Sequence, residues 1–470
     1  IELTRRRAEI NYERHKNCPN LEIVVGDFFQ IPFRQKFDYV IVNGVLEYAA
    51  YMKHSANPYV DFLQTAASHL KDDGRLLLAI ENRLGLKYFS GSREDHTGEY
   101  FSGLNNYSAG EKVRTFSKKE LKDVILDSGL YPIKFFYPYP DYKFPSEIFT
   151  DGSINERKPT AINYPLDMSR VELFSEDKVY ESLMRQGIMD VFSNSFLVEI
   201  ARNPDALPTD ISYVKISANR NKDFRICTYI DATKTKAIKK ALEPEAVNHV
   251  ENMAKYSGRR FGRIRNFPYD SRVENGLSYE FIREHSLESK LSEALIAGEK
   301  DSCIRILADF RDALYGNQAP EEIALSDEFV RIFGESKPAK PLRWVRDVNI
   351  DMVIGNIFVV GDEYWVIDYE WHLPVKAPLE FVMWRTLRQF IDGYQVDWFT
   401  CGDLCEFLDI DLETLRVFQE WEIHFVYSYV GAVDLSLLSK HSINLDIARV
   451  ESRILQENTV YSTLFFDTGD

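Results

Sequence analysis

Apolar and polar positions alternate with two different periods in the first 203 residues of the chain. Short apolar runs that end in turn residues, the pattern of buried strands, lie at residues 21–25, 37–44, 75–82, 131–140 and 192–203. Residues 59–70 and 117–130 have helical spacing; the sequence KDDG is expected to stop the first helix, and Ser117 with Glu120 has capping-box spacing at the start of the second. Strands that alternate with amphipathic helices predict an α/β fold with a parallel, doubly wound (Rossmann-like) sheet.

The pattern changes after residues 204–210, where two prolines follow the last of these strands. Residues 211–242 alternate as a β meander, residues 243–258 form a capped helix, and residues 276–282 form a further strand. Most of the remainder has helical spacing, which predicts an α+β domain. The predicted organisation is a first domain over 1–203, a linker over 204–210, a second domain over 211–455, and the start of a further segment, with a strand, over 456–470.

Composition narrows the classes of protein. Of the 470 residues, 45% are hydrophobic and 28% are charged, which is typical of globular proteins. The formal net charge of -16 repels phosphate backbones, so nucleic acid is not the expected partner. No apolar stretch reaches membrane-spanning length, no signal peptide is apparent, and five scattered cysteines favour a reducing compartment, so a cytoplasmic location is predicted. Because the chain starts at Ile1 and ends in an apolar run, we expect a fragment of a longer protein.

Polar residues follow the predicted strands of the first domain at the positions where α/β sheets bind ligands. Glu2 precedes a helix, Asp27 follows residues 21–25, the sequence NGVLEY (43–48) follows the next strand, and Glu81 follows the one after. One acidic strand end suits the hydroxyls of a ribose, and an aspartate one strand later suits an adenine amino group. Glu2 and Asp27 could equally be solvated turn residues of another α/β domain.

These segments resemble class I S-adenosylmethionine-dependent methyltransferases over about residues 1–140, beginning just after the family's glycine-rich first motif, which this chain lacks. The resemblance implies a cofactor site with Glu2 at the ribose, Asp27 and Phe28 at the adenine, and Asn43, Gly44 and Glu47 at the methionine side and the methyl-transfer point. The polar, aromatic loop 82–111 is a candidate acceptor lid. Glu94, Asp95 and His96 in this loop are candidate acceptor or base groups, with His96 the candidate catalytic residue, although a solvated charged loop would have the same composition.

A second candidate site lies in the stretch from Arg346 to Trp371. Asp351 is followed five positions later by Asn356, and a hairpin-like apolar run then ends at Asp368. In kinase-type sites an aspartate orients the acceptor hydroxyl, and an asparagine and a second aspartate hold magnesium. The spacing therefore indicates Asp351 as the catalytic residue and Asn356 with Asp368 as metal ligands.

Over about residues 211–400 the chain resembles the aminoglycoside phosphotransferase and choline kinase group. The resemblance implies ATP and magnesium, with Lys239 at the phosphates and Glu251 or Glu245 as its ion-pair partner. Asn349 stands where the usual histidine would be, and residues 217–223 are a poor glycine-rich loop. Turnover by this domain is therefore left open, and a pseudokinase is the alternative.

Together these segments predict a methyltransferase for a sugar, polysaccharide or phosphorylated glycan, joined to a kinase-like domain. Such pairings resemble bacterial enzymes of surface-polysaccharide assembly. The partners expected are a glycan or small-molecule acceptor and, through peripheral association, a polysaccharide assembly complex. A noncatalytic scaffold, in which both domains bind nucleotides or partners without turnover, is the competing hypothesis.

Overall fold

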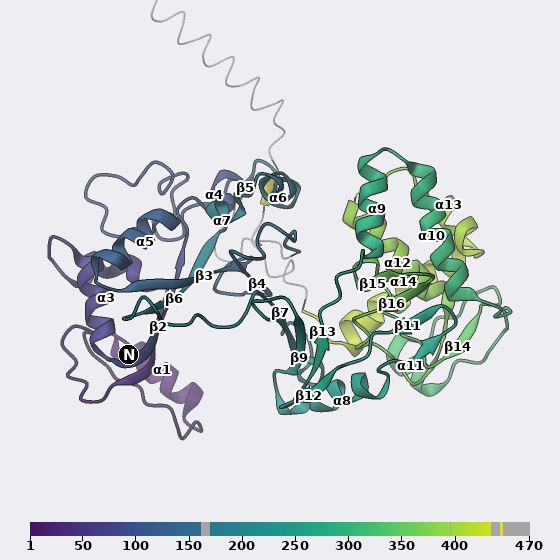
Figure 1. Cartoon of the computed structure of the whole chain (residues 1–470), viewed down its shortest axis with the longest axis horizontal. Helices are drawn as coiled ribbons and strands as arrows, with labels where there is room; N and C mark the ends of the chain where they lie inside the picture. Colours follow the sequence, from purple (N-terminus) through teal and green to yellow (C-terminus); the bar gives the residue numbers. More distant parts are fainter. Residues whose placement is uncertain (161–169, 395, 434–441, 445–470) are drawn as a thin grey trace, which may run out of the picture. The chain divides into compact units, whose positions relative to one another are not determined.

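The computed structural model describes residues 1–160, 170–394, 396–433 and 442–444 (Figure 1). Contacts divide the chain into a first unit, Ile1–Val214 with Leu435–Asp470, and a second unit, Lys215–Asp434. The predicted further segment over 456–470, with its strand, lies outside the described residues. None of the described helices is both long enough and apolar enough to cross a membrane.

The first unit contains a mixed α/β arrangement. Its strands are β1 (Phe37–Asn43), β2 (Leu70–Glu81), β3 (Tyr131–Tyr139), β4 (Glu147–Thr150), β5 (Arg170–Glu172), β6 (Ser195–Ala201) and β18 (Ser442–Asn444). Its helices are α1 (Arg5–His15), the 3-10 turn η1 (Leu46–Tyr48), α2 (Ala49–Met52), α3 (Pro58–Ser68), α4 (Leu86–Phe89), α5 (Lys118–Asp127), α6 (Glu176–Arg185) and α7 (Met189–Phe192).

The sheet of this unit has the strand order β1-β2-β6-β3-β4, and it is not the parallel sheet that the sequence predicted. Strands β1 and β2 are parallel, but β6 is antiparallel to both β2 and β3, and β4 is antiparallel to β3. Strands β1, β2 and β3 therefore run in one direction around the reversed strand β6. Apolar alternation cannot reveal this reversal, because a strand buries the same side chains in either direction.

The core of the first unit forms where β2 and β6 pair. Leu76, Leu78 and Ile80 alternate along β2 with complete burial, and each lies opposite an equally buried residue of β6. These cross-strand partners are Ile200, Val198 and Phe196 respectively. Matched apolar pairs of this kind stabilise a sheet and hold its register, so the carboxyl end of β2 is held in place by a fully buried part of the sheet.

Two local predictions for the first unit were wrong. Residues 21–25 form no strand, because their pairing with the rest of the sheet is limited to a bridge between Val25 and Glu2. The sequence KDDG does not itself end the preceding helix: α3 ends at Ser68, and residues 71–74 belong to β2. The glycine of this stretch, Gly74, lies against the backbone of β1, with an added Cβ only 3.0 Å from the Phe37 carbonyl oxygen.

The capping box predicted at the start of α5 is present. The Ser117 hydroxyl accepts from the Glu120 backbone N–H, while the Glu120 carboxylate accepts from the Ser117 N–H at 2.8 Å. Arg83 adds two hydrogen bonds to the same carboxylate, at 2.7 and 3.1 Å. Burial acts to raise the pKa of Glu120, but the hydrogen bonds from Arg83 and Ser117 outweigh it and lower the pKa to about 2.

We therefore expect Glu120→Gln to destabilise the first unit by about 1 kcal/mol at pH 7, because glutamine can still cap the helix but loses the charge in the two hydrogen bonds from Arg83. Because the pKa of Glu120 is lower in the folded protein, its contribution is complete above the pKa of the unfolded chain, near 4.5, and is lost as the pH falls toward about 2. Urea unfolding at pH 7 and pH 3 measures the difference. Asp123→Asn, which removes an exposed partner of Lys119 on the same helix, is the control and should have little effect. A Glu120→Gln penalty that did not shrink at low pH would contradict the assignment.

The second unit begins with strands and continues mostly with helices. Its strands are β7 (Tyr213–Ser217, which starts just before the division), β8 (Ile226–Ile230), β9 (Lys236–Ala241), β10 (Arg260–Phe261), β11 (Ile264–Asn266), β12 (Ser271–Val273), β13 (Gly276–Glu280), β14 (Trp344–Arg346), β15 (Ile357–Val360), β16 (Glu363–Val366) and β17 (Lys376–Pro378). Its α-helices are α8 (Val247–Lys255), α9 (Leu287–Ile296), α10 (Lys300–Tyr315), α11 (Asp327–Phe333), α12 (Leu379–Tyr394), α13 (Cys401–Leu408) and α14 (Leu412–Ile423).

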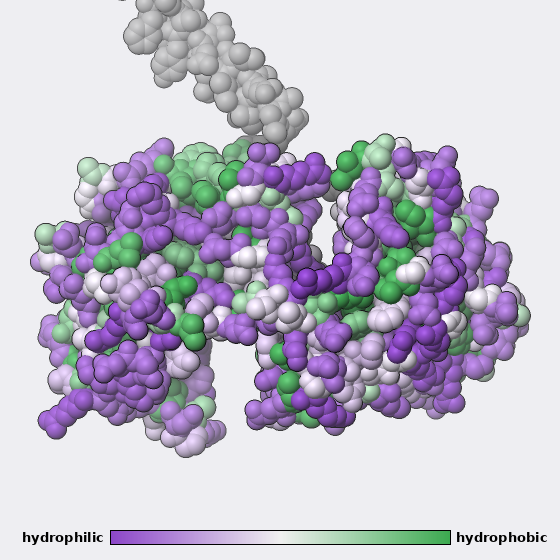
Figure 2. All heavy atoms as spheres, viewed as in Figure 1, coloured by the Kyte–Doolittle hydropathy of each residue, from purple (hydrophilic) through white to green (hydrophobic). Residues whose placement is uncertain are grey.

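The β meander predicted for the start of this unit is present, in the order β7-β8-β9-β13-β12. Strands β15 and β16 form an antiparallel hairpin, and the 3-10 turn η4 (Ile354–Asn356) leads into it. Figure 1 shows α9 and α10 side by side, and their buried faces join α11, α12 and α14 in one apolar core. In Figure 2 hydrophilic residues cover most of the visible face of each unit.

Candidate functional site

Three strand ends of the first unit lie at one edge of its sheet. Because β1, β2 and β3 run in the same direction, their carboxyl ends, at Asn43, Glu81 and Tyr139, point to the same side. The residues at or beyond these ends, together with part of the loop 82–111, form what we call the strand-end cluster. Its members are Gly44, Glu47, Glu81, Glu94, His96, Tyr142 and Lys143.

His96 lies at the centre of the strand-end cluster. Its Nδ1 atom is 3.0 Å from Glu94 Oε1, and its Nε2 atom is 3.5 Å from Glu47 Oε1 and 3.9 Å from Glu81 Oε2. Burial acts to lower the pKa of His96, but hydrogen bonding to Glu47 and Glu94 and the charge of Glu81 raise it to about 10. In this state the imidazole carries a proton at neutral pH and is a poor general base. To act as the predicted base, His96 would need a lower pKa, which requires that the negative charge of the surrounding carboxylates be reduced.

The carboxylates around His96 differ in their hydrogen bonds. Glu94 Oε2 accepts from the backbone N–H groups of His96 and Thr97, at 2.8 and 2.7 Å, and these bonds help to lower the pKa of Glu94 although burial opposes them. Glu47 is fully buried on η1, and burial raises its pKa. Glu81 Oε1 accepts from Lys143 Nζ at 2.8 Å and from the Tyr142 hydroxyl at 3.2 Å.

Lys143 connects Glu81 of the strand-end cluster to a second acid, the half-buried Asp95. Its Nζ atom also lies 2.9 Å from Asp95 Oδ1, and Lys87 Nζ lies 2.8 Å from Asp95 Oδ2. Burial acts to raise the pKa of Asp95, but the two lysines together hold it well below its usual value. Asp95, a predicted acceptor or base group, is therefore committed to these ion pairs and is not available as a base.

Gly44 gives the strand-end cluster its close packing. Its φ of +60° lies in the left-handed region, and a Cβ atom added there would lie 2.5 Å from the Tyr142 hydroxyl oxygen. Glycine avoids both the conformational strain and this clash. Gly44, Glu47 and His96, which the sequence identified separately, are thus brought together by the fold.

The remaining predicted cofactor residues lie in another part of the first unit. The backbone of Glu2 bonds to Val24 and Gly26, which places Glu2 beside Asp27. Phe28 packs against Phe62 of α3, with the ring centroids 5.0 Å apart. Asn43, at the end of β1, is exposed. Among the described residues, no hydrogen bond or ion pair joins Glu2 or Asp27 to the strand-end cluster, and their predicted roles remain predictions.

Sequence reasoning missed Tyr142 and Lys143. A signal for them existed, because both follow the apolar run at 131–140 just as Glu81 follows its own strand. The signal was incomplete, since the sequence did not reveal that β3 runs in the same direction as β2.

The second unit brings together Asp351, Asp368 and Glu370. One carboxylate oxygen from each lies within 4.8 Å of the others, an arrangement able to hold a cation. Asn356 Nδ2 donates to the Asp351 carbonyl oxygen at 3.3 Å, so this asparagine is also next to the group. The structure therefore gathers the three residues that the kinase-type spacing identified, and it adds Glu370.

Lys239 lies in this group, but not with its expected partner. It forms an ion pair with Asp368, and this contact raises the pKa of Lys239 although burial opposes it. The expected pairing with Glu251 is absent, because Glu251 is exposed and pairs with Arg272 at 2.6 Å. On α8 it is His249 that faces inward, and two positions along a helix turn a side chain by about 200°. Glu245 instead lies 3.8 Å from Lys222.

Four further residues of this site were not found from the sequence. Glu370 is held by two hydrogen bonds from Arg220, at 3.1 and 3.0 Å, and lies 3.0 Å from His249 Nε2. Burial acts to raise the pKa of Glu370, and Arg220 and His249 outweigh it and lower the pKa. The fourth residue, Arg385 of α12, lies 3.3 Å from Asp351 Oδ1. All these partners are distant in sequence, so no local pattern identifies them.

Asp351 is the carboxylate of this site with an unusual titration. Burial and the nearby charges of Asp368 and Glu370 raise its pKa to about 6, and Arg385 opposes the change. Asn349, in the place of the usual histidine, is buried and accepts from the Asp351 backbone N–H at 3.0 Å. The asparagine therefore holds the backbone of the predicted catalytic aspartate.

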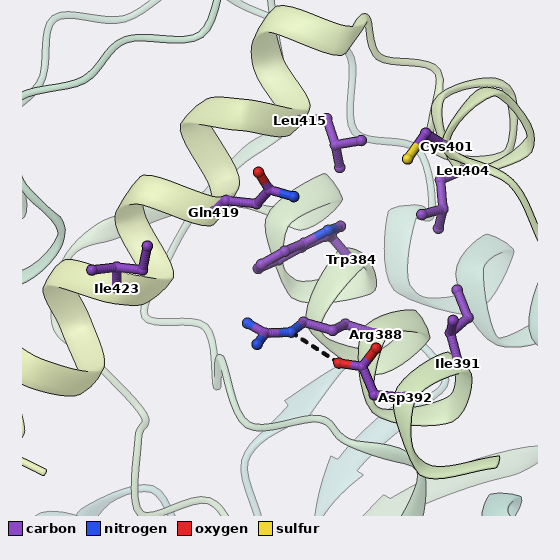
Figure 3. Close-up of a pocket in the computed structure, with 9 residues that line it drawn as sticks. All are labelled: Trp384, Arg388, Ile391, Asp392, Cys401, Leu404, Leu415, Gln419 and Ile423. Atoms are coloured by element: carbon purple, nitrogen blue, oxygen red, sulfur yellow. Dashed lines mark hydrogen bonds and ion pairs between the residues drawn. The ribbon is translucent and has the colours of Figure 1, made fainter. Parts of the chain in front are cut away.

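Two pockets open near Arg385 on the helical part of the second unit. One, of about 450 Å³, is lined by Val353, Arg385 and Glu422 among others, and so adjoins the Asp351 side chain through Arg385. The other, of about 460 Å³, is lined by residues of α12, α13 and α14 (Figure 3). The two share the ion pair between Arg388 and Asp392, at 3.2 Å.

Comparison with known proteins gives limited likenesses. No protein-family model matches the chain. Over 114 residues, 24% of the chain, it is 29% identical to an uncharacterized methyltransferase of Staphylococcus carnosus, and it spans about half the length, 50%, of that relative.

Among solved structures, the apoenzyme of the macrolide 2'-phosphotransferase MphH from Brachybacterium faecium aligns with 46% of this chain and 84% of its own, at 10% identity and a TM-score of 0.20. PKMT2 from Rickettsia typhi, in complex with AdoHcy, aligns with 90% of this chain and 87% of its own, at 11% identity and a TM-score of 0.24. The chain is a mixed α/β protein, part of which is similar in sequence to a methyltransferase.

Proposed function

We propose that the first unit is an S-adenosylmethionine-dependent methyltransferase. The observation that carries this proposal is the convergence of Gly44, Glu47 and Glu81 beyond the carboxyl ends of the parallel strands β1 and β2. Ligands of open α/β sheets bind at such ends. The chain is also 29% identical over 114 residues to an uncharacterized methyltransferase, which supports this activity for the chain.

In this proposal Glu2, Asp27 and Phe28 hold the ribose and adenine, and Asn43, Gly44 and Glu47 border the methionine part. The backbone bridge that sets Glu2 beside Asp27 is compatible with the two residues serving one ligand. His96, from the loop after β2, faces the acceptor. Methyl transfer needs chiefly alignment of an acceptor with an already activated methyl group, which is a task for a rigid, buried cluster.

The acceptor that we propose is a hydroxyl group of a sugar or glycan. The strand-end cluster presents several carboxylates, and carboxylates accept hydrogen bonds from hydroxyl groups. A polar acceptor also suits Tyr142 and Lys143, which extend the cluster.

Titration calorimetry of the full-length protein with S-adenosylmethionine tests the cofactor assignment. We expect Glu2→Ala or Asp27→Ala to weaken binding by about 1–3 kcal/mol, the usual loss for a hydrogen bond to a charged group. Glu22→Ala removes an exposed carboxylate between the two positions and serves as the control. Unchanged affinity in both test variants would show that the ribose and adenine lie elsewhere.

We propose magnesium-dependent ATP binding, with phosphoryl transfer to a hydroxyl acceptor, for the second unit. The specific observation in its favour is the grouping of Asp351, Asp368 and Glu370, with Lys239 paired to Asp368. In the proposed arrangement Asn356 and Asp368 hold magnesium, Lys239 contacts phosphates and Asp351 orients the acceptor. The pocket lined by Arg385 and Glu422 offers polar groups to a polyhydroxy acceptor.

The alternative to both proposals is a noncatalytic scaffold, in which both units bind nucleotides or partners without turnover. Measured turnover of S-adenosylmethionine or ATP with a glycan acceptor would support catalysis. Binding of both ligands without turnover would instead favour the scaffold.

A further inference from the structure

Two carboxylate oxygens in the strand-end cluster lack a hydrogen-bond donor. Glu47 and Glu81 are 1% and 0% exposed, and the Oε2 atom of each has no hydrogen-bond partner among the described residues. A buried carboxylate oxygen without a hydrogen-bond donor is costly, because it has lost its water, and protonated His96 comes no closer than 3.5 Å to Glu47 and 3.9 Å to Glu81. Such an atom therefore points to a positively charged group that completes the site.

The geometry around these two glutamates suits a metal ion. One ligand atom each from Glu47, Glu81 and His96 lies within 4.8 Å of the others, and His96 Nε2 is 3.5 and 3.9 Å from the two carboxylates. Donor atoms bound to one ion at about 2.1 Å lie about 3.0–3.4 Å apart. The two distances from His96 Nε2 exceed this range by about 0.1 and 0.5 Å, and the 4.8 Å bound on the group means that the two carboxylates must close by at most about 1.4 Å.

Glu94 orients the imidazole as a partner of a metal-bound histidine does. It lies 3.0 Å from His96 Nδ1, while two backbone N–H groups hold its other oxygen. A proton on Nδ1, donated to Glu94, leaves the lone pair of neutral His96 on Nε2, where it faces Glu47 and Glu81. A carboxylate on the outer nitrogen is the usual support of a metal-ligating histidine.

The charges of the cluster match a divalent cation. The groups joined by ion pairs around this site are four carboxylates, those of Glu47, Glu81, Glu94 and Asp95, and the cations Lys87 and Lys143 with His96. A metal ion bound at Nε2 would replace the proton that His96 otherwise carries there, and the four negative and two positive charges that remain then give a net charge of -2. One divalent ion cancels that charge.

We propose that Glu47, Glu81 and His96 bind a divalent transition-metal ion in the first unit. A ligand set of two carboxylates and one imidazole suits Mn²⁺ or Zn²⁺ better than Mg²⁺, because Mg²⁺ prefers oxygen ligands alone. Three protein ligands leave coordination positions open, as in catalytic metal sites. If the proposed methyltransferase function holds, an acceptor oxygen could take such a position; the metal site itself does not depend on that function.

The experiment titrates the metal-free full chain with ZnCl₂ or MnCl₂ alone, without nucleotide or S-adenosylmethionine. Asp351→Asn with Asp368→Asn forms the background, so that the second unit's carboxylates contribute little. We expect one tightly bound ion per chain, and a loss of affinity on the order of 100-fold or more in Glu47→Gln, Glu81→Gln or His96→Ala. Glu94→Gln should weaken binding by about 10–100-fold, as removal of a ligand's support does.

Glu99→Gln, an exposed carboxylate in the same loop, is the matched control and should bind like the parent. Visible absorption of the Co²⁺-loaded protein reports direct coordination, and His96→Ala should change that spectrum. If a variant folds poorly, the change in Tm on adding Zn²⁺ replaces the affinity measurement. We expect Zn²⁺ to raise the Tm of the parent more than that of Glu47→Gln. The proposal would be overturned if the parent bound no metal tightly, or if all three ligand substitutions left metal binding unchanged. Titration with S-adenosylmethionine would still test the proposed methyltransferase function separately.

Discussion

Asp368→Ala is expected to abolish measurable Mg-ATP binding by the second unit, whereas Asp351→Asn should keep binding within about threefold and eliminate phosphoryl transfer. Magnesium requires hard oxygen ligands, and Asp368 is the carboxylate that also contacts Lys239, the proposed phosphate-binding residue. Its loss would remove a metal ligand and leave Lys239 buried without that partner. Asp351 instead contacts Arg385 and Asn356 and matters only once an acceptor is in place.

Calorimetry with Mg-ATP and a phosphoryl-transfer assay separate the two roles. Asp362→Ala removes an exposed carboxylate on the β15–β16 hairpin and should change neither readout. Equal loss of Mg-ATP binding in the Asp351 and Asp368 variants would contradict the division of roles. Absence of Mg-ATP binding by the unmutated, folded protein at millimolar ATP would refute the catalytic proposal for this unit.

Gly44→Ala is expected to lower the methyl-transfer rate by about 100-fold, the scale of a 1 Å misplacement in an active site. The added Cβ would lie 2.5 Å from the Tyr142 hydroxyl, which donates to Glu81, and the residue would hold a φ of +60°. Tyr142 must move, and its hydrogen bond to Glu81 must lengthen or break. The rate of methyl transfer to a glycan acceptor, at saturating S-adenosylmethionine, measures the effect.

Two variants separate the clash from backbone strain. Gly129 has a similar φ of +76°, but nothing lies within 4 Å of an added Cβ. Gly129→Ala should therefore introduce backbone strain without a clash and leave the methyl-transfer rate unchanged. Adding Tyr142→Phe to Gly44→Ala removes the oxygen at 2.5 Å and leaves the ring carbon at 3.4 Å, an acceptable contact. We expect this double variant to recover part of the lost rate. A Gly44→Ala rate no lower than that of Gly129→Ala would show that this contact is unimportant.

The elements that the sequence predicted well are those in which neighbouring residues determine the outcome. Strands β1, β2, β3 and β6 all overlap predicted apolar runs, and the Ser117–Glu120 capping box is present at the start of α5. Caps and apolar alternation depend on side chains within a few positions of each other, so a single sequence displays them. Residues 21–25 have the same apolar pattern but no strand, because a strand also needs a neighbouring strand along its length.

The residues of the candidate sites also divide into those that local sequence patterns identified and those that only the fold brings into contact. Position after a strand identified Gly44 and Glu47, and kinase-type spacing identified Asp351, Asn356 and Asp368, since these relations are local along the chain. The partner of Lys239 could not be identified in this way. Glu251 has suitable spacing, but Asp368, 129 positions away, is the residue in contact.

By itself, the sequence determined the positions of β1, β2, β3 and β6 and of the start of α5, the acidic charge of the chain, and the placement of Gly44, Glu47 and Glu81 after strands. The tertiary structure decided that β6 runs against its neighbours, which sets the ends of β2 and β3 at one edge and brings Lys143 to Glu81. It also placed Arg220 and His249 on Glu370. The physical reason is that strand direction and long-range charge pairing depend on how separate elements pack together, and the same local pattern of apolar and polar residues is compatible with several such packings.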